Sequence, residues 1–314
     1  MRNKVKIINA KEEKVNFIIN GIRGLCMALA DSVPGVSGGT IAFILGFYDK
    51  FINSLDSLVF GKKEEKKKAI KFLIKLGIGW LIGMILAVLV LTNLFQNQIY
   101  KVSSVFMGFI IFSIPLIIKE EKESLKGKYK NLIFTLIGIG VVAAVTYFNP
   151  MTGEENVVNL SNLNPGLCIY VFIAAMIAIS AMVLPGISGS TLLLIFGLYI
   201  PIISAIKDLL HLNFSVLPIL IIFGLGVITG IILVIRLIKI ALKKYRSQTI
   251  YCIIGLMIGS LYAIAMGPTT LEIPKAPMSI ETFSIIFFIL GGAIIFGLEK
   301  IKSVLEKRQK GELE

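Results

Sequence analysis

A glycine- and hydroxyl-rich signature occurs twice in this chain. It reads VPGVSGGT at 33–40 and LPGISGST at 184–191, and each copy runs on to a Gly-x-Tyr that ends at Tyr48 or Tyr199. The shared residues recur at a single offset of 151. Serine and threonine hydroxyls donate hydrogen bonds, and a helix that begins just after a Pro-Gly break presents unpaired backbone N–H groups, which bind anions. The pattern therefore predicts a site for a phosphate or a carboxylate.

The predicted binding groups are the glycines, serines and threonines of both copies. Glycines let a ligand approach the backbone closely, and hydroxyls add donors. Paired Gly/Pro-interrupted apolar segments in the two halves of a membrane chain are typical of a transporter's substrate site. The alternative is that the hydroxyls cap the following helices and the glycines only form the turn. The residues expected to bind substrate are Gly35, Ser37, Gly38, Gly39 and Thr40 in the first copy and Gly186, Ser188, Gly189, Ser190 and Thr191 in the second.

Charged residues accompany the first copy without counterparts in the second. Arg23 corresponds to Ala174, and Asp49 corresponds to Ile200. An arginine can donate two parallel hydrogen bonds to one phosphate, so we include Arg23 among the expected binding residues. The alternative is that Arg23 pairs with Asp31. Asp31 or Asp49 could carry a coupling ion, a proton or sodium, because acids inside a membrane often mark ion pathways. Either could equally be a salt-bridged structural acid.

A catalytic role is the less favoured interpretation of these residues. The one histidine, His211, falls in an expected external loop, and the sequence has no HExxH motif. A Ser-Lys hydrolase would need a lysine near Ser37 or Ser188, but the nearest, Lys50 and Lys207, lie many residues away. A membrane lipid phosphatase or transferase usually needs a general acid/base or a metal cluster. We therefore expect a protein that is not an enzyme and holds neither cofactor nor metal.

The composition places these residues in a membrane. Of the 314 residues 56% are hydrophobic and 16% charged, and the mean hydropathy is +0.86, which excludes a pair of soluble domains. Apolar stretches of about 17–25 residues can cross a bilayer as helices. The expected spans are 72–95, 102–118, 131–148, 216–238, 249–267 and 282–298. The sequence thus predicts an all-α polytopic membrane protein.

The charge distribution predicts its orientation. The net charge is +13, but 27 of the 32 Lys and Arg residues fall in five clusters, which argues for cytoplasmic loops over a nucleic-acid surface. These clusters are Arg2 to Lys14, 62–75, 119–130, 236–246 and Lys300 to Lys310. The distribution predicts a cell-membrane protein with both termini in the cytoplasm.

The signatures divide the chain into two similar halves. Gly77, Gly79 and Gly83 match Gly224, Gly226 and Gly230 at an offset of 147, and small residues at this spacing let helices pack closely. We expect a first repeat at 1–148, an external linker at 149–165 and a second repeat at 166–314. Each repeat would contain a hairpin, 15–59 or 166–210, followed by three of the spans.

The basic loops also predict how the halves are related. The first hairpin begins and ends on the cytoplasmic side, whereas the second begins and ends outside, so the repeats are inverted across the membrane, as in many transporters. The Pro-Gly breaks and the charges of the first hairpin favour re-entrant hairpins over two full crossings, because broken backbone at membrane depth must be buried in protein or face water.

The residues 30–42, ADSVPGVSGGTIA, followed by LGFYD at 45–49, resemble a bacterial family of polyprenyl-phosphate transporters of the PopT type. The second signature is similar to that family's second motif, and the likeness covers nearly the whole chain. It implies transport of undecaprenyl phosphate, the lipid carrier of cell-wall precursors, back to the cytoplasmic leaflet for reuse. The family often has an acid after its first Gly-x-Tyr, here Asp49, but Ile200 departs from that pattern.

The resemblance leads to a working hypothesis. The phosphate enters from outside through the second signature, is held between the two turns and leaves inward past the first, while the isoprenoid tail stays in lipid. The alternative is a secondary transporter of another anion, either a different lipid phosphate or a small organic acid.

Overall fold

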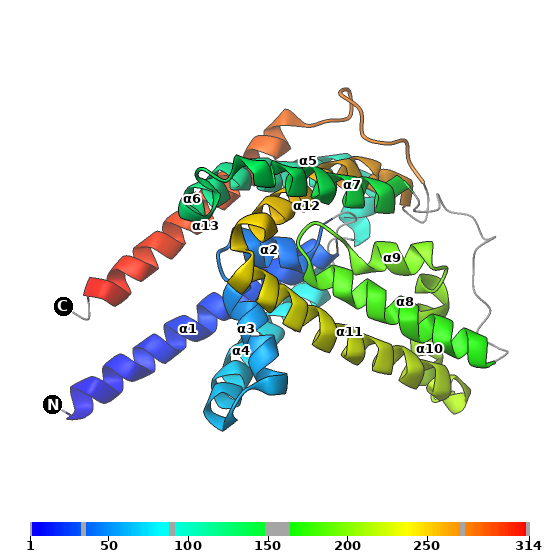
Figure 1. The fold of residues 1–314 in the computed structure, drawn as a ribbon, viewed down its shortest axis with the longest axis horizontal. Coiled ribbons are helices and arrows are strands. Elements are labelled where there is room, and N and C mark those ends of the chain that lie inside the picture. The colour runs from blue at the N-terminus through cyan, green and yellow to red at the C-terminus, as the bar shows by residue number, and fades with distance from the viewer. Residues whose placement is uncertain (1, 33–35, 88–91, 148–163, 271–273, 312–314) are drawn as a thin grey trace.

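The computed structural model describes residues 2–32, 36–87, 92–147, 164–270 and 274–311, and within these ranges the chain forms helices and no strands (Figure 1). The predicted all-α class is confirmed. The helices are α1 (Arg2–Asp31), α2 (Gly38–Ile44), α3 (Tyr48–Phe60), α4 (Lys63–Leu86), α5 (Thr92–Glu120), α6 (Lys122–Leu125), α7 (Leu132–Tyr147), α8 (Pro165–Val183), α9 (Gly189–Ile195), α10 (Tyr199–Leu210), α11 (Leu217–Lys244), α12 (Arg246–Met266) and α13 (Ile285–Gly311). Short 3₁₀ turns lie at Tyr129–Asn131, Phe214–Val216 and Gly267–Thr270.

Six helical segments of the described chain are long and apolar enough to cross a bilayer, which confirms a polytopic membrane protein. They are Lys63–Leu86, Gln98–Glu120, Tyr129–Tyr147, Pro165–Val183, Phe214–Lys244 and Arg246–Thr269. Five of them overlap expected spans. The sixth is α8, which we expected only as a hairpin arm. The expected span 282–298 corresponds to the start of α13, whose apolar part, Ile285–Gly297, is shorter than the others.

Helix α4 begins nine residues before the expected span at 72–95. Its start is fixed by a polar cap: the Lys62 backbone N–H donates to Glu65 Oε2 at 2.8 Å. This side-chain cap satisfies a backbone amide at the start of the helix. The lysine-rich stretch is therefore the first part of the helix and not a separate loop.

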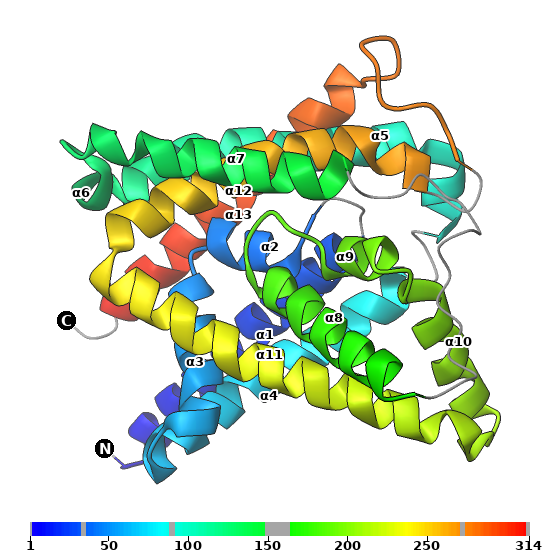
Figure 2. The same cartoon turned by 45° about the vertical axis from the view of Figure 1, so that its right-hand side comes forward.

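Four helix pairs build the bundle. Helix α1 packs on α4, and α8 packs on α11; α5 packs on α13, and α7 packs on α12 (Figures 1 and 2). The first two pairs join helices of the same half of the chain. The last two join helices of different halves, so the halves are interlocked.

Glycines set the closeness of the first two pairs. A Cβ on Gly79 would lie 1.9 Å from the Gly21 carbonyl oxygen, and a Cβ on Gly226 would lie 2.4 Å from that of Phe172. Gly21 and Phe172 are separated by the same 151 residues as the signatures. The prediction that these glycines serve packing holds here and at Gly83 and Gly230. It is wrong for Gly77 and Gly224, where a Cβ would meet nothing within 4 Å.

The same contact recurs in the pairs that cross between halves. A Cβ on Gly108 would lie 2.1 Å from the Phe288 carbonyl oxygen, and one on Gly255 would lie 2.2 Å from that of Thr135. The partner helices carry glycines in the same relation. A Cβ on Gly291 would lie 2.1 Å from the Val105 carbonyl oxygen, and one on Gly138 would lie 2.5 Å from that of Cys252. Two helix pairs from distant parts of the chain thus share one packing geometry.

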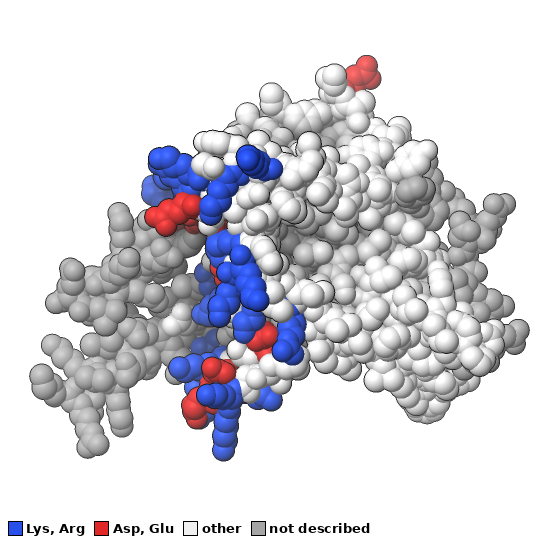
Figure 3. All heavy atoms as spheres, viewed as in Figure 1, with Lys and Arg blue, Asp and Glu red and all other residues white. Residues whose placement is uncertain are grey.

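Basic side chains gather on one side of the molecule. In Figure 3 the Lys and Arg atoms form a band that crosses the visible face, beside a broad area that is almost free of charge. Charged groups avoid hydrocarbon, so the band marks one edge of the membrane-embedded part.

Candidate functional site

Both signatures fold into the same broken-helix unit. In the first, α1 ends at Asp31 and the seven-residue α2 begins at Gly38; in the second, α8 ends at Val183 and the seven-residue α9 begins at Gly189. Each short helix is followed, two residues after its last residue, by a glycine with positive φ: Gly46 at 68° after α2 and Gly197 at 62° after α9. Only glycine adopts this left-handed conformation without strain, and it commonly terminates helices. The Gly-x-Tyr of the signature is therefore a helix stop followed by a new helix.

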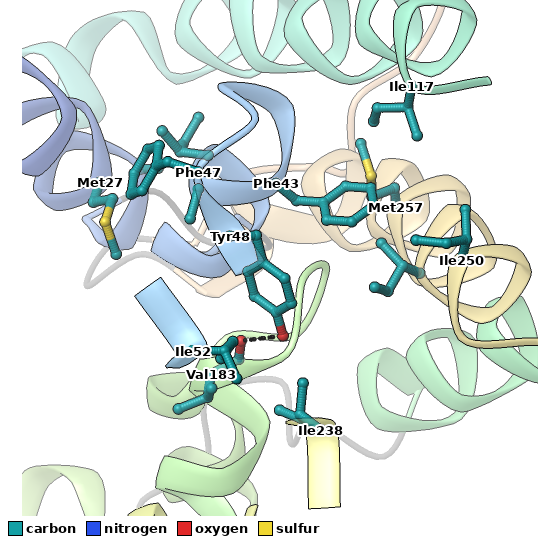
Figure 4. Packing of buried hydrophobic residues seen from close by; sticks show 14 of the residues in the cluster. Met27, Phe43, Phe47, Tyr48, Ile52, Ile117, Val183, Ile238, Ile250 and Met257 are labelled. Atoms are coloured by element: carbon teal, nitrogen blue, oxygen red, sulfur yellow. Dashed lines mark hydrogen bonds between the residues drawn. The ribbon is translucent and has the colours of Figure 1, made fainter. Parts of the chain in front are cut away.

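The two signatures touch one another in the interior. The Gly186 backbone N–H donates to Thr40 Oγ1 at 2.7 Å, and Ser37 Oγ donates to the Leu184 carbonyl at 3.2 Å. The Tyr48 hydroxyl donates to the Val183 carbonyl at 3.2 Å, as Figure 4 shows. The structure thus brings together two turns that lie 151 residues apart in the sequence.

Glycine permits this contact. A Cβ on Gly39 would lie 2.7 Å from the Val183 carbonyl oxygen, and Gly186, at φ 88°, has no room for one beside Leu256. Around the turns, buried side chains such as Phe43, Tyr48 and Met257 form the main hydrophobic cluster (Figure 4). The polar contact is therefore enclosed by hydrocarbon.

Within the first copy the hydroxyls also bind each other. Ser37 is the N-cap of α2, because its Oγ accepts from the Thr40 N–H at 3.2 Å and lies 3.0 Å from Thr40 Oγ1. Both side chains are buried. The capping alternative is thus observed for Ser37 in this conformation. Gly35, another predicted binding residue, lies outside the described residues.

The second copy is organised differently. Ser188 is the N-cap residue of α9, but its side chain makes no capping hydrogen bond; it pairs with the Ser190 hydroxyl at 2.8 Å. Gly189 packs against α8, where a Cβ would lie 2.9 Å from the Ala178 carbonyl oxygen. Thr191 is half-buried on the first turn of α9. The Ser188 hydroxyl therefore does not cap its helix, in contrast to the Ser37 hydroxyl.

Asp31 stabilises the start of α2. Its carboxylate accepts from the Gly38 N–H at 2.6 Å and from Trp80 Nε1 at 3.0 Å. Arg23 lies elsewhere: its guanidinium stacks on the Phe47 ring at 4.9 Å and donates to Asn20 Oδ1 at 3.2 Å. Both predicted residues thus lie beside the first unit, Asp31 on its turn and Arg23 on its Gly-x-Tyr.

Asp49 belongs to an ion-pair network. Arg246 at the start of α12 contacts Asp49 Oδ2 at 3.0 Å and forms a bidentate ion pair with Glu121, which lies between α5 and α6. Lys239 of α11 pairs with Asp56 of α3. Asp49 is thus a salt-bridged acid, one of the two roles considered for it. The sequence did not single out its partners, because they fall within clusters interpreted only as topological charge.

A second group of cations lies between α1, α3 and α4. The Lys50 ammonium sits over the Phe72 ring at 4.8 Å, and Arg23 and Lys75 lie within electrostatic range of it. Among the described residues no three His, Cys, Asp or Glu side chains are close enough to hold a metal ion. The groups that the two turns and this cluster present are hydroxyls, backbone amides and cationic side chains.

Known proteins are similar to this chain over most of its length. A family model described as undecaprenyl phosphate translocase-like matches residues 27–282. A protein of Staphylococcus aureus named polyprenyl-phosphate transporter is 35% identical over 289 residues, which cover 90% of this chain and 96% of the relative. A protein of Vibrio cholerae with the same name is 29% identical over 319 residues, covering 91% and 97%. No solved structure matches.

The matched region contains both signatures and every candidate residue except Arg23, which lies four residues before it. Its relatives carry the names of transporters, in agreement with the expectation of a protein that is not an enzyme. The chain belongs to the undecaprenyl phosphate translocase-like family.

Proposed function

We propose that this protein is a polyprenyl-phosphate translocase that moves undecaprenyl phosphate from the outer to the cytoplasmic leaflet of a bacterial cell membrane, for reuse in cell-envelope synthesis. One observation carries the proposal beyond the names of the relatives. Two helix-breaking turns, distant in sequence, bind each other through Thr40 and Gly186 inside an apolar bundle. Hydroxyls and backbone amides at that depth suit an anionic group that must cross hydrocarbon.

The phosphate would bind where the turns now bind each other. A phosphate in an apolar environment needs donors and positive charge to offset its lost hydration. Separation of the turns would release the Gly186 N–H and the Ser37 and Thr40 hydroxyls, and the Ser188–Ser190 pair would add two more. We assign Arg23 the role of the cation that accompanies the phosphate inward, since it lies beside the first unit.

The recurring contacts support two repeats, 1–148 and 166–314. The α8–α11 pair has the same glycine–carbonyl contacts as the α1–α4 pair, and the α12–α7 pair has the same contacts as the α5–α13 pair. The band of basic side chains supports cytoplasmic termini and, with it, an inverted relation of the repeats. Hairpins that enter from opposite sides and touch at their tips would be re-entrant. The bend of 107° between α9 and the start of α10 is compatible with that arrangement.

Alternating access follows from this arrangement. The second turn would open outward and the first inward, and their mutual contact would close the path between the two states. We assign coupling by a proton or sodium to Asp31, because it lies against the first turn, whereas Asp49 is engaged by Arg246. The carboxylate of Asp31 retains lone pairs beyond those used by Gly38 and Trp80.

Binding measurements separate this function from transport of another anion. Purified protein in lipid nanodiscs is heated with undecaprenyl phosphate, with undecaprenol or with inorganic phosphate. We expect a rise in Tm with the lipid phosphate that exceeds the rise with either part alone. Stabilisation by a water-soluble anion without any response to undecaprenyl phosphate would refute the proposal and favour the anion transporter. Release of inorganic phosphate from the lipid would instead favour an enzyme.

A further inference from the structure

An apolar cavity of about 490 Å³ lies between α1, α2, α5 and α13. Its wall includes Cys26 from α1, Ile41 from α2, Phe109 from α5 and Leu290 from α13. The volume lies within the range of about 300–1,000 Å³ that is usual for small-molecule sites. Apart from two residues, the lining side chains carry only hydrocarbon, aromatic rings and one thiol.

The two polar residues stand together at one end. Gln98 and Lys101 both lie on the first turns of the unkinked part of α5, since the helix is broken at Gln98 by non-helical dihedral angles (φ −131°, ψ 29°). Phe109 lies about two to three helical turns farther along. The Lys101 ammonium sits 5.6 Å from the centre of the Phe287 ring, which lines the same end. The cavity thus has a single cation at one end and hydrocarbon along its remaining length.

The corresponding place in the other half of the chain is filled. At the offset of the signatures Ile41 corresponds to Leu192, and at the offset of the spans Phe109 corresponds to Leu256. Leu192 and Leu256 pack with Val142 in one buried cluster. The position of Lys101 corresponds to Gln248, so the cation is also missing there. Among the described residues, the α1–α2–α5–α13 side thus has an apolar cavity with a positive charge at one end, whereas the matching positions of the other half hold a buried apolar cluster.

We infer that this cavity binds the first isoprene units of a polyprenyl phosphate on entry, with the phosphate held at Lys101 before it passes to the site between the two turns. The chemistry of the lining requires an amphiphile: a ligand that is apolar over most of its length and anionic at one end. In the proposed topology α5 and α13 both begin on the outer side, so the Lys101 end faces the leaflet from which the lipid enters. Ile41 lies one residue after Thr40, so the cavity reaches the first turn.

This inference rests on the proposed function and sharpens it in one respect. The expectation that the whole tail stays in lipid is replaced by capture of its head-proximal part within the protein. The remainder of a long isoprenoid exceeds the cavity and would stay in the bilayer.

A photo-crosslinking experiment tests the site. Wild-type protein in nanodiscs is irradiated with undecaprenyl phosphate that carries a diazirine in its second isoprene unit, and the modified peptides are identified by mass spectrometry. We expect adducts on cavity residues of α5 and α13, removed by excess unlabelled undecaprenyl phosphate and not by phosphatidylglycerol. Adducts spread over bilayer-facing residues of α11, or removed equally by phosphatidylglycerol, would show a general lipid groove and overturn the inference.

Two matched variants add a functional readout. Leu290→Trp would fill the cavity, whereas Ile289→Trp places the same ring on the neighbouring residue, which does not line it; the two side chains are similarly exposed, at 47% and 56%. We expect Leu290→Trp to weaken binding of undecaprenyl phosphate about tenfold, because several methylene groups lose their buried site. Lys101→Ala should weaken it as well, and Lys101→Arg should restore it. Equal binding by the two tryptophan variants would contradict the inference.

The outcomes distinguish the cavity from the function itself. If the wild-type protein translocates undecaprenyl phosphate while Leu290→Trp does so at the same rate, the tail site is wrong and the function stands. If the wild-type protein neither binds nor translocates this lipid, both fail.

Discussion

The Thr40 hydroxyl oxygen lies 2.7 Å from the backbone nitrogen of Gly186, and this hydrogen bond joins the two halves of the chain at their helix breaks. Both groups are buried, so neither has water as an alternative partner. A transporter that opens to one side at a time needs a contact that forms and breaks between its halves. We propose that this hydrogen bond is that contact.

Removing the hydroxyl while keeping the shape tests the contact. Thr40→Val leaves the Gly186 N–H buried without an acceptor, which costs roughly 1–3 kcal/mol. We expect a lower Tm and slower translocation, and we expect Thr40→Ser to retain most of both. Thr229→Ala is the control, because the Thr229 hydroxyl bonds only the Leu225 carbonyl of its own helix among the contacts described. A Thr40→Val protein with the Tm and rate of the control would contradict this role.

The Asp31 carboxylate can be tested through the one tryptophan of the chain. Asp31→Ala removes the acceptor of both the Gly38 N–H and the Trp80 indole, at roughly 1–3 kcal/mol for each buried donor. We expect a shifted Trp80 emission spectrum and a lower Tm. Asp31→Asn keeps one of the two acceptor oxygens, so it should lower the Tm less than Asp31→Ala does, and it should remove the dependence of transport on an ion gradient. Gradient-dependent transport by Asp31→Asn would exclude Asp31 as the coupling residue.

Arg246 should be coupled more strongly to Glu121 than to Asp49. The Glu121 side chain is 16% exposed and accepts two hydrogen bonds from the Arg246 guanidinium, whereas the Asp49 side chain is 48% exposed. Exposed ion pairs contribute about 0.2–1 kcal/mol and weaken with salt. Double-mutant cycles on thermal unfolding at low and high salt measure both coupling energies. The ranking fails if the Asp49 coupling is the larger one or resists salt.

The glycines of α4 offer an internal comparison. Gly79→Ala places a methyl group against the Gly21 carbonyl and should separate α1 from α4, with a large loss of Tm. Gly77→Ala meets nothing within 4 Å and should be neutral or stabilising by up to about 1 kcal/mol, because alanine favours helix. The second half repeats the test with Gly226→Ala and Gly224→Ala. Similar Tm values for Gly79→Ala and Gly77→Ala would show that the α1–α4 contact tolerates expansion.

The membrane class and the broken signatures could be predicted because they depend on local chemistry. Apolar length determines which segments can cross a bilayer, and Pro-Gly pairs interrupt helices wherever they occur. Helix starts were less predictable: the cap of Glu65 on Lys62 extends α4 through residues that hydropathy assigns to a loop. The local sequence pattern also cannot show which glycines contact a neighbouring helix. Gly79 lies against the backbone of α1 and Gly77 does not, and this difference depends on where the neighbouring helix packs.

In the candidate site, too, some features follow from the local sequence and others depend on tertiary packing. The duplication of the signature predicts that the two turns meet, but it does not predict the hydrogen-bond partners of each side chain. Ser37 caps its own helix while Ser188 pairs with Ser190, although both occupy the same place in the motif. Arg246 and Lys239 come from clusters that look uniform in sequence, and only tertiary packing selects them for Asp49 and Asp56.

The central claim is that the two turns form one phosphate site on a path across the membrane. Its most direct test uses vesicles of known protein orientation, with undecaprenyl phosphate in the leaflet that faces the outer side, and follows its appearance on the cytoplasmic side with a membrane-impermeant phosphatase. We predict rapid transfer by the wild-type protein and by Thr229→Ala, and at least tenfold slower transfer by Arg23→Ala, Ser37→Ala and Ser188→Ala. Unchanged transfer in all three variants would place the site elsewhere and contradict the account.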